Sequence, residues 1–249
     1  MSSAETPNLN RQAEWTAVVA ALVFPSIMTW AYFVWLADGA SSITYGVYGV
    51  GKALQFAFPL IWVVLVLRQR PRLHPPDRRG VPLGLAFGGL VLAAMLGLYF
   101  FWLKPAGFFE QGAGEQVREK IASLKLDRLW AYVACSVFYS LLHSLAEEYY
   151  WRWFVFGRMR LLVSLPVAVI VSSLGFMAHH IILLSVFFGW FSPAAILFSL
   201  AVAIGGAAWA CLYHLSRSLY GPWWSHLLVD AGIFLIGYDL ARDLFSVSG

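Results

Sequence analysis

The chain has 249 residues, of which 60% are hydrophobic, 17% are aromatic and only 12% are charged. Soluble domains carry about 25% charged residues, so this composition excludes a disordered chain, a collagen-like chain and an ordinary soluble enzyme. The net charge is +4, but the basic residues are not interleaved with aromatics in a patch, and we expect no nucleic-acid partner. The composition indicates a chain whose solvent is lipid.

Seven apolar runs of about 20 residues or more follow one another along the chain. A helix of that length crosses about 30 Å of hydrocarbon and satisfies its own backbone hydrogen bonds, which lipid cannot do. The predicted fold class is therefore an all-α, polytopic transmembrane helix bundle with about seven to eight spans; the higher number applies if Pro166 separates a short element. The runs are 14–37, 44–67, 82–103, 128–157, 163–188, 191–214 and 221–240.

Two glycine-containing patterns lie in the first three runs. Gly80, Gly84 and Gly88 recur at every fourth residue, a spacing typical of close packing between membrane helices. Residues 46–53 match most of a phosphate-binding loop, but the final Ser or Thr is missing and no strand precedes them, so we reject that function. We expect Lys52 to extend its ammonium group to the membrane interface.

The loops between the runs alternate in charge. Loops 68–81 and 215–220 and the segment 158–160 contain arginine, whereas loops 38–43 and 189–192 contain neither Lys nor Arg. By the positive-inside rule the arginine-containing group is cytoplasmic, which places the N-terminus in the cytoplasm.

Residues 104–128 are the exception, because they mix basic and acidic side chains. Val117, Ile121 and Leu124 recur there at a spacing of three to four residues. This pattern predicts an amphipathic helix that lies along the membrane surface.

The fourth run carries the polar residues that matter most for function. Ionisable groups are costly in lipid, so each one within a span is a candidate functional residue. Glu148 and Arg152 are four residues apart on one helix face, which predicts a buried ion pair. Glu147 points about 100° away and has only His143 on its own face, so we expect it to be free for proton transfer. His143 has two open interpretations: a hydrogen bond to Glu147, or contacts with a neighbouring helix.

The fifth and seventh runs add four further polar side chains. His179 and His180 are neighbours in the fifth run, and His226 and Asp230 are four residues apart in the seventh. Isolated polar groups in lipid would be unsatisfied, so we expect these side chains to converge with the glutamates. A carboxylate base together with imidazoles is suited to hydrolysis by an activated water.

The apolar runs also contain a cluster of aromatic residues and both cysteines of the chain. Tyr149, Tyr150, Trp151 and Trp153 are predicted to form an aromatic belt at the membrane interface, or alternatively to line a groove for a hydrophobic substrate. Both cysteines, Cys135 and Cys211, are interpreted as small buried core residues.

Three motifs, in this order, resemble those of the CPBP family, which comprises type II CAAX prenyl proteases and bacteriocin-processing and self-immunity proteins. The motifs are Glu147-Glu148-x-x-x-Arg152, Phe176-x-x-x-His180 and His226-x-x-x-Asp230. The resemblance covers roughly residues 125–240. It implies an intramembrane endopeptidase that cuts near the terminus of a lipid-linked or hydrophobic peptide. We therefore divide the chain into N-terminal helices (1–125) and a catalytic core (126–249), which we expect to form one structural unit.

The resemblance also implies a role for each motif residue. Glu147 and His180 would activate the water, while Glu148 and Arg152 would hold the site together. His179 and His143 are secondary candidates on the same helices.

The third motif is expected to act on the transition state. His226 and Asp230 would stabilise the tetrahedral oxyanion. Since an ionised aspartate cannot donate a hydrogen bond, Asp230 would have to be protonated or to act through His226.

A metal ion is the main alternative to this mechanism. Glu147, His180 and His226 could supply a zinc site of two histidines and one carboxylate. The chain has no His-Glu-x-x-His motif, and we favour a mechanism without metal or cofactor.

Two other functions remain open at this point. A proton-coupled transporter could use Glu147, His180 and Asp230 as a relay, and an immunity or scaffold protein could retain the motifs without catalysis. For the protease we expect a hydrophobic or lipidated peptide substrate, contacts with membrane lipid, and a location in the bacterial or archaeal cell membrane.

Overall fold

The computed structural model describes residues 10–36, 42–71, 73–110 and 112–246, and every regular element in these ranges is helical. The predicted all-α fold class is therefore confirmed. Within these described ranges, six helical segments are long and apolar enough to cross a membrane. Most of the neutral loop 38–43, and Arg72 in the basic loop 68–81, lie outside the described residues.

The first three apolar runs each form one long helix that ends in a π-helical turn. The helices are α1 (Arg11–Trp30), α2 (Ser42–Ile61) and α3 (Gly80–Leu98), and the π-helical turns are Ala31–Trp35, Trp62–Val66 and Tyr99–Leu103. Asn10 begins α1 by accepting a hydrogen bond from the backbone nitrogen of Ala13 at 3.1 Å, which satisfies one of the free amides of the first turn.

The fourth run is a continuous helix from Leu129 to Leu162, longer than the predicted 128–157. It alternates between α-helical and π-helical geometry, and π-helical turns are frequent at functional sites. Its parts are α5 (Leu129–Val137), a π-helical segment (Phe138–His143), α6 (Ser144–Glu148), a second π-helical segment (Tyr149–Phe156) and α7 (Gly157–Leu162).

Three long helices and one short one complete the chain: α8 (Leu165–Phe188), α9 (Pro193–Ser216), α10 (Tyr220–Leu240) and α11 (Arg242–Ser246). Pro166 lies in the first turn of α8, where proline fits without breaking a helix, so it separates no extra element. Helix α10 has 21 residues and matches the seventh run, but it is not among the six segments that qualify by length and composition. Its passage through the membrane remains a prediction.

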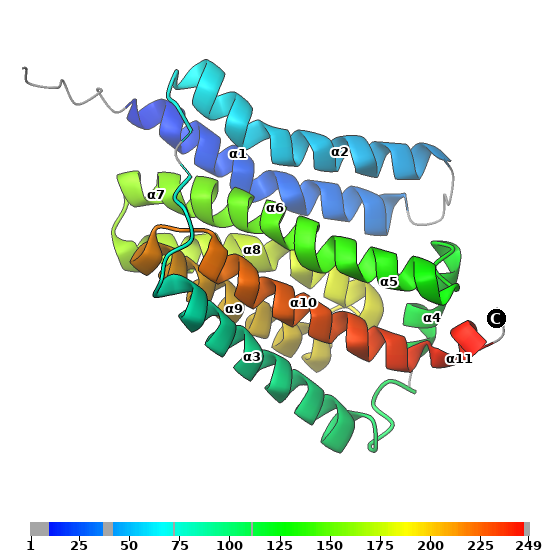
Figure 1. The fold of residues 1–249 in the computed structure, drawn as a ribbon. Helices are drawn as coiled ribbons and strands as arrows, with labels where there is room; N and C mark the ends of the chain where they lie inside the picture. Colours follow the sequence, from blue (N-terminus) through cyan, green and yellow to red (C-terminus); the bar gives the residue numbers. More distant parts are fainter. Residues whose placement is uncertain (1–9, 37–41, 72, 111, 247–249) are drawn as a thin grey trace, which may run out of the picture.

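Successive long helices run in opposite directions, so that the loops gather at two ends of the bundle (Figure 1). The segments around 68–81, 158–160 and 215–220 lie at one end, together with the start of α1. The 189–192 loop and α4 (Ala113–Ser123) lie at the other end. The basic loops and the described neutral loop 189–192 thus lie at opposite ends, as predicted. The assignment of the basic end to the cytoplasm remains a prediction.

Helix α4 corresponds to the amphipathic helix predicted within 104–128. Ile121 on its apolar face is buried, and Arg118 donates a hydrogen bond from Nη1 to the carbonyl oxygen of Leu240 at 3.2 Å. Leu124 is the exception on this face, because it lies just beyond the helix and is exposed. Helix α4 therefore covers the end of α10.

Two predictions about single side chains in the spans have different outcomes. The Nζ of Lys52 lies 5.7 Å from the ring centroids of both Tyr48 and Phe56, one turn before and one turn after it in α2, and the position of its ammonium group at the membrane interface remains a prediction. Cys211 is exposed on the outside of α9 and Cys135 is only partly buried, so the cysteines are not core residues.

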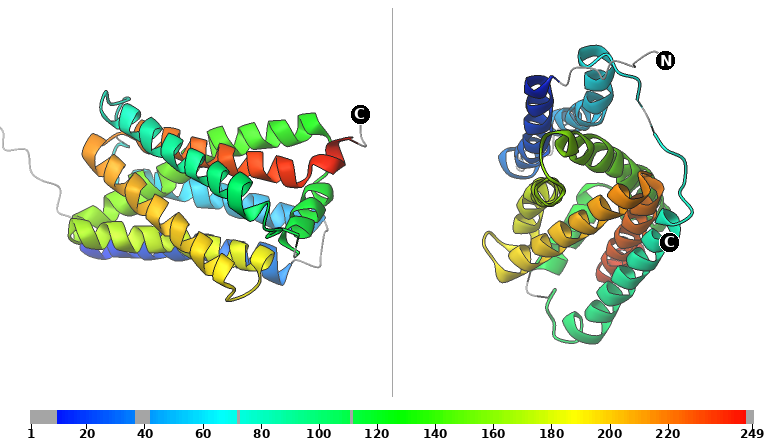
Figure 2. Two further views of the ribbon diagram at one scale, coloured as in Figure 1. Left: turned by 90° about the horizontal axis from the view of Figure 1, so that it is seen from below. Right: turned by 90° about the vertical axis from the view of Figure 1, so that its left-hand side faces the viewer.

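The glycine ladder in α3 packs against α10, and the two helices lie side by side in all views (Figures 1 and 2). A Cβ atom on Gly84 would clash with the backbone carbonyl of Gly221, and one on Gly88 would lie only 2.7 Å from Cα of Ser225. The predicted close packing is confirmed. It fixes the backbone of α10 directly beside His226, the residue after Ser225.

We expect the variant Gly84→Leu to force α3 away from α10, because the leucine has no space beside Gly221. Overpacking of this kind costs about 1–3 kcal/mol, and thermal unfolding of the purified protein in detergent should show a lower midpoint. Gly89→Leu is the matched control, since a Cβ atom on Gly89 has nothing within 4 Å. Equal midpoints for the two variants would contradict the proposed role of the ladder.

Candidate active site

The candidate residues of three separate helices converge inside the bundle. Glu147 and Glu148 lie in α6, His179 and His180 in α8, and His226 in α10. The two glutamates, His179 and His226 are each at most 6% exposed. These polar side chains therefore lie close together as expected, and the hydrogen bond between Glu148 and His226 joins residues 78 positions apart in the sequence.

Glu148 is the centre of a buried ion-pair network. Its Oε2 lies 3.1 Å from Nε of Arg152, and its Oε1 accepts a hydrogen bond from Nδ1 of His226 at 2.9 Å. The guanidinium of Arg152 also lies over the rings of Phe176 and Trp209, at 4.7 and 5.2 Å, an arrangement favoured by cation–π attraction. One carboxylate thus joins α6 to α10, and the cation that compensates its charge is supported by α8 and α9.

Glu147 has a different environment. Its Oε1 lies 3.7 Å from Nε2 of His179, and its Oε2 lies 3.8 Å from Nε2 of His226. Both distances are longer than a hydrogen bond between nitrogen and oxygen. The two glutamates therefore differ as their spacing predicts: Glu148 is closely paired, and Glu147 lies between imidazoles without a short contact to either.

His226 is held in one orientation by groups on every side. Its ring stacks on Trp209 at 4.2 Å and 17°, and the indole nitrogen of Trp209 donates a hydrogen bond to Oγ of Ser225 at 2.9 Å. With Nδ1 donating to Glu148, the other nitrogen faces Glu147 and also lies 3.6 Å from Oδ1 of Asp230. Carboxylates of three acids surround this imidazole, and their Coulombic attraction favours an imidazolium.

The two histidines of α8 have different surroundings. His179 is buried, stacks parallel to Trp151 at 5.6 Å and is the one that approaches Glu147. His180 is partly exposed, and its Nδ1 lies 2.8 Å from the carbonyl oxygen of Phe176. Since a carbonyl only accepts, Nδ1 carries the proton, and Nε2 of neutral His180 is left with a free lone pair.

His143 lies one helical turn before Glu147, at the edge of the cluster. Its ring contacts Tyr139 at 4.9 Å and Phe56 of α2 at 5.8 Å. Of its two interpretations, these contacts favour packing against a neighbouring helix.

The predicted aromatic belt after Glu148 is wrong for two of its four residues. Tyr150 and Trp151 are at most 1% exposed; Tyr150 donates a hydrogen bond to the carbonyl oxygen of Ala21 in α1 at 2.8 Å. Tyr149 and Trp153 are partly exposed and stack on each other at 5.1 Å. The buried Trp151 supports the site, because its ring stacks on His179.

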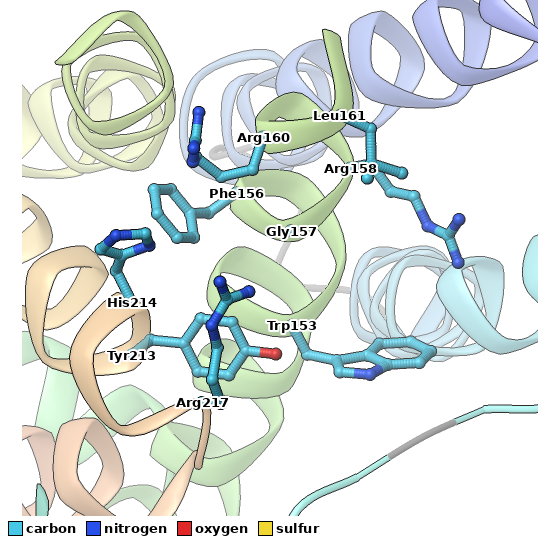
Figure 3. Close-up of a pocket in the computed structure, with 9 residues that line it drawn as sticks. All are labelled: Trp153, Phe156, Gly157, Arg158, Arg160, Leu161, Tyr213, His214 and Arg217. Atoms are coloured by element: carbon cyan, nitrogen blue, oxygen red, sulfur yellow. The ribbon is translucent and has the colours of Figure 1, made fainter. Parts of the chain in front are cut away.

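A separate pocket of about 410 Å³ lies between α7 and the end of α9. Figure 3 shows Tyr213 and Arg217 reaching from the α9 side towards the helix that carries Trp153 and Gly157. Its lining includes three arginines and a histidine but no carboxylate. It lacks an acid that could activate water, so it is not the hydrolytic site.

The proposed zinc ligands do not form a metal site in the described part of the chain. No group of three His, Cys, Asp or Glu side chains there is arranged to hold a metal ion. His226 donates from Nδ1 to Glu148, which leaves its Nε2 as the nitrogen that could bind a metal. We derive no step through a metal ion, and the mechanism without metal remains a prediction.

Sequence reasoning missed the residues that support the site. Trp209 and Ser225 position His226, and Glu14 of α1 pairs with Arg158 at 3.1 Å at the basic end of the bundle. Glu14 could have been identified from the sequence, because it is an acidic residue near the beginning of an apolar run. Trp209 had none, since one tryptophan among many in an apolar chain indicates nothing by itself.

A family model described as type II CAAX prenyl endopeptidase, Rce1-like, matches residues 128–232. The matched segment contains all three motifs and every residue of the polar cluster. Comparison with curated proteins and with solved structures gave no match. The resemblance noted from the three motifs is thus confirmed by the family model.

Proposed function

We propose that this chain hydrolyses a peptide bond near the end of a lipidated or hydrophobic peptide with a water activated by Glu147. The proposal is supported by the match of residues 128–232 to the family model of Rce1-like type II CAAX prenyl endopeptidases. The observation that carries the proposal is the contrast between the two glutamates. Glu148 is neutralised by Arg152 and His226, while Glu147 has no contact shorter than 3.7 Å to an imidazole. A carboxylate in that position can accept a proton from water.

The first step is the attack of water on the scissile carbonyl carbon. Glu147 takes one proton from the water, and the oxygen forms the new bond to carbon. His180 is proposed to assist through its free Nε2, which can accept a hydrogen bond from the same water. His179 is proposed to position the Glu147 carboxylate, from which its Nε2 lies 3.7 Å away.

The second step is the collapse of the tetrahedral intermediate. Its oxyanion would accept a hydrogen bond from Nε2–H of the His226 imidazolium, a contribution typical of oxyanion stabilisation. The carbon–nitrogen bond then breaks, and the proton held by Glu147 passes to the leaving amine. Asp230 is proposed to act through His226, since its Oδ1 lies 3.6 Å from Nε2; it need not donate to the oxyanion.

The direct test uses the purified chain in lipid vesicles with a farnesylated peptide that ends in a C-a-a-X sequence. Mass spectrometry should detect a shortened lipidated product together with the released C-terminal fragment. Absence of both products from an otherwise folded, membrane-inserted protein would refute the proposal.

The two histidines of α8 should respond differently to substitution. We expect His180→Ala to reduce kcat about 10²-fold or more, in the range typical of lost general acid–base assistance. His179→Gln should have a smaller effect, because glutamine retains a donor near Glu147. Initial rates at saturating peptide would separate the variants. A larger loss for His179→Gln than for His180→Ala would reverse the two proposed roles.

Removal of divalent metal ions is expected to leave the cleavage rate unchanged. The reason is that Glu147, His179 and His226 lie together without an arrangement suited to a metal ion. The measurement is the rate before and after incubation with 1,10-phenanthroline, with a zinc protease as the positive control. Loss of activity that added zinc restores would instead support the zinc alternative.

A further inference from the structure

Lys52 is a charged residue in the middle of a helix that the sequence assigns to the membrane. It lies ten residues after Ser42, where α2 begins, and fourteen before Val66, where its π-helical turn ends. At 1.5 Å per residue these separations are about 15 and 21 Å. An ionisable group at such depth is costly and is a functional candidate, and the proposed mechanism does not use it.

The ammonium group of Lys52 stays at the level of its own backbone. It is equally far from the rings of Tyr48 and Phe56, at 5.7 Å from each centroid. Cation–π attraction favours this position between the two rings. Within the described part of the chain, no carboxylate forms an ion pair with it.

The side of α2 that carries Lys52 faces the polar cluster. Phe56, which lies under the ammonium group, contacts the ring of His143 at 5.8 Å. His143 is one turn from Glu147 on the same helix. Lys52 is thus on the side of α2 that contacts the helix carrying Glu147.

We infer that Lys52 binds the terminal carboxylate of the substrate peptide, with Tyr48 and Phe56 contacting the side chain of its last residue. This inference rests on the proposed function. A C-a-a-X sequence stands at the end of its protein, so a bond cut within it lies at most three residues from a free carboxylate. Three extended residues span about 10 Å, and the ring contacts Lys52–Phe56 at 5.7 Å and Phe56–His143 at 5.8 Å connect the cation to the helix that carries the catalytic acid. A lysine without a carboxylate partner can supply the countercharge.

The test compares two peptides that are identical except at the C-terminus, one a free acid and the other an amide. We expect the unmodified protein to cleave the acid with a kcat/KM roughly ten- to a hundredfold higher, the range for a charged hydrogen bond. Lys52→Met should remove this preference by raising KM for the acid to the value for the amide. Lys52→Arg should restore part of the preference. Lys125→Met, at an exposed lysine outside the apolar runs, is the matched control.

Each result decides the question. Equal cleavage of acid and amide by the unmodified protein overturns the inference but leaves the proposed function intact, as does an equal loss for both peptides in Lys52→Met. If the Met variant does not fold, Lys52→Gln replaces it, and the comparison of the two peptides on the unmodified protein stands without any variant. Cleavage of neither peptide would refute the proposed function itself, and the inference with it.

Discussion

Glu147→Gln is expected to lower kcat about 10²- to 10⁴-fold, the range typical of a lost general base, while leaving the protein folded. Glutamine has the same shape as glutamate but cannot take a proton from water. The fold should tolerate the change, because the carboxylate of Glu147 makes no short contact, with 3.7 and 3.8 Å to the two nearest imidazoles. The measurement is the single-turnover rate of peptide cleavage in vesicles.

Binding and folding of this variant must be measured separately from cleavage. A fluorescent lipidated peptide should still bind Glu147→Gln with nearly unchanged affinity, and the thermal midpoint should be preserved. Glu119→Gln, on the exposed side of α4, is the control for loss of one negative charge. A scaffold protein would show no cleavage before or after the change, and a proton-coupled transporter would instead lose pH-driven flux. Unchanged cleavage by Glu147→Gln would refute the assigned base.

Much of the fold was predictable because it follows from hydropathy alone. Six of the seven apolar runs became segments suited to crossing a membrane, with ends within a few residues of those predicted; the exception in length is the fourth, which extends to Leu162. The glycine ladder also predicted its own contact, since only a small residue permits the approach of α3 to Gly221. These features depend on composition and spacing, which can be read directly from the sequence.

The details of the site were less predictable because they depend on the rotation of each helix. A difference of one residue rotates a side chain by about 100°, so helix spacing alone could not decide between His179 and His180. The resemblance implied His180 as the partner of Glu147, whereas it is His179 whose Nε2 lies 3.7 Å from the Glu147 carboxylate. The π-helical segments on both sides of α6 further change the direction in which each side chain points. No sequence pattern predicts these segments. The burial of Trp151 has the same origin: it occupies the face that turns towards His179.

The contacts that one span makes with its neighbours also cannot be predicted from the sequence of that span alone. Lys52 was expected at the membrane interface because lysines usually extend towards water. The structure places aromatic rings on both sides of it along α2. The rings near the ammonium group belong to its own helix face, and Phe56 in turn contacts His143 of a neighbouring helix.

Arg152→Leu is expected to destabilise the protein by about 3–5 kcal/mol, because it leaves the buried carboxylate of Glu148 without its principal cation. Glu148 is fully buried, and its remaining partner is His226 at 2.9 Å. The thermal midpoint in detergent should fall clearly, and cleavage should be lost with it. The leucine retains apolar contact with Phe176 and Trp209, over which the guanidinium lies, so the loss reports on charge more than on packing.

The double variant Glu148→Leu/Arg152→Leu separates stability from activity. Removing both charges together abolishes the unpaired carboxylate, and replacing a buried ion pair by apolar residues is often neutral for stability. We therefore expect its midpoint to recover towards that of the unmodified protein. Cleavage should not recover, because Nδ1 of His226 then has no acceptor and the imidazole loses the contact that orients it towards Glu147. If the double variant is as active as the unmodified protein, Glu148 does not position His226. If it is less stable than Arg152→Leu, the ion pair is not the source of the expected destabilisation.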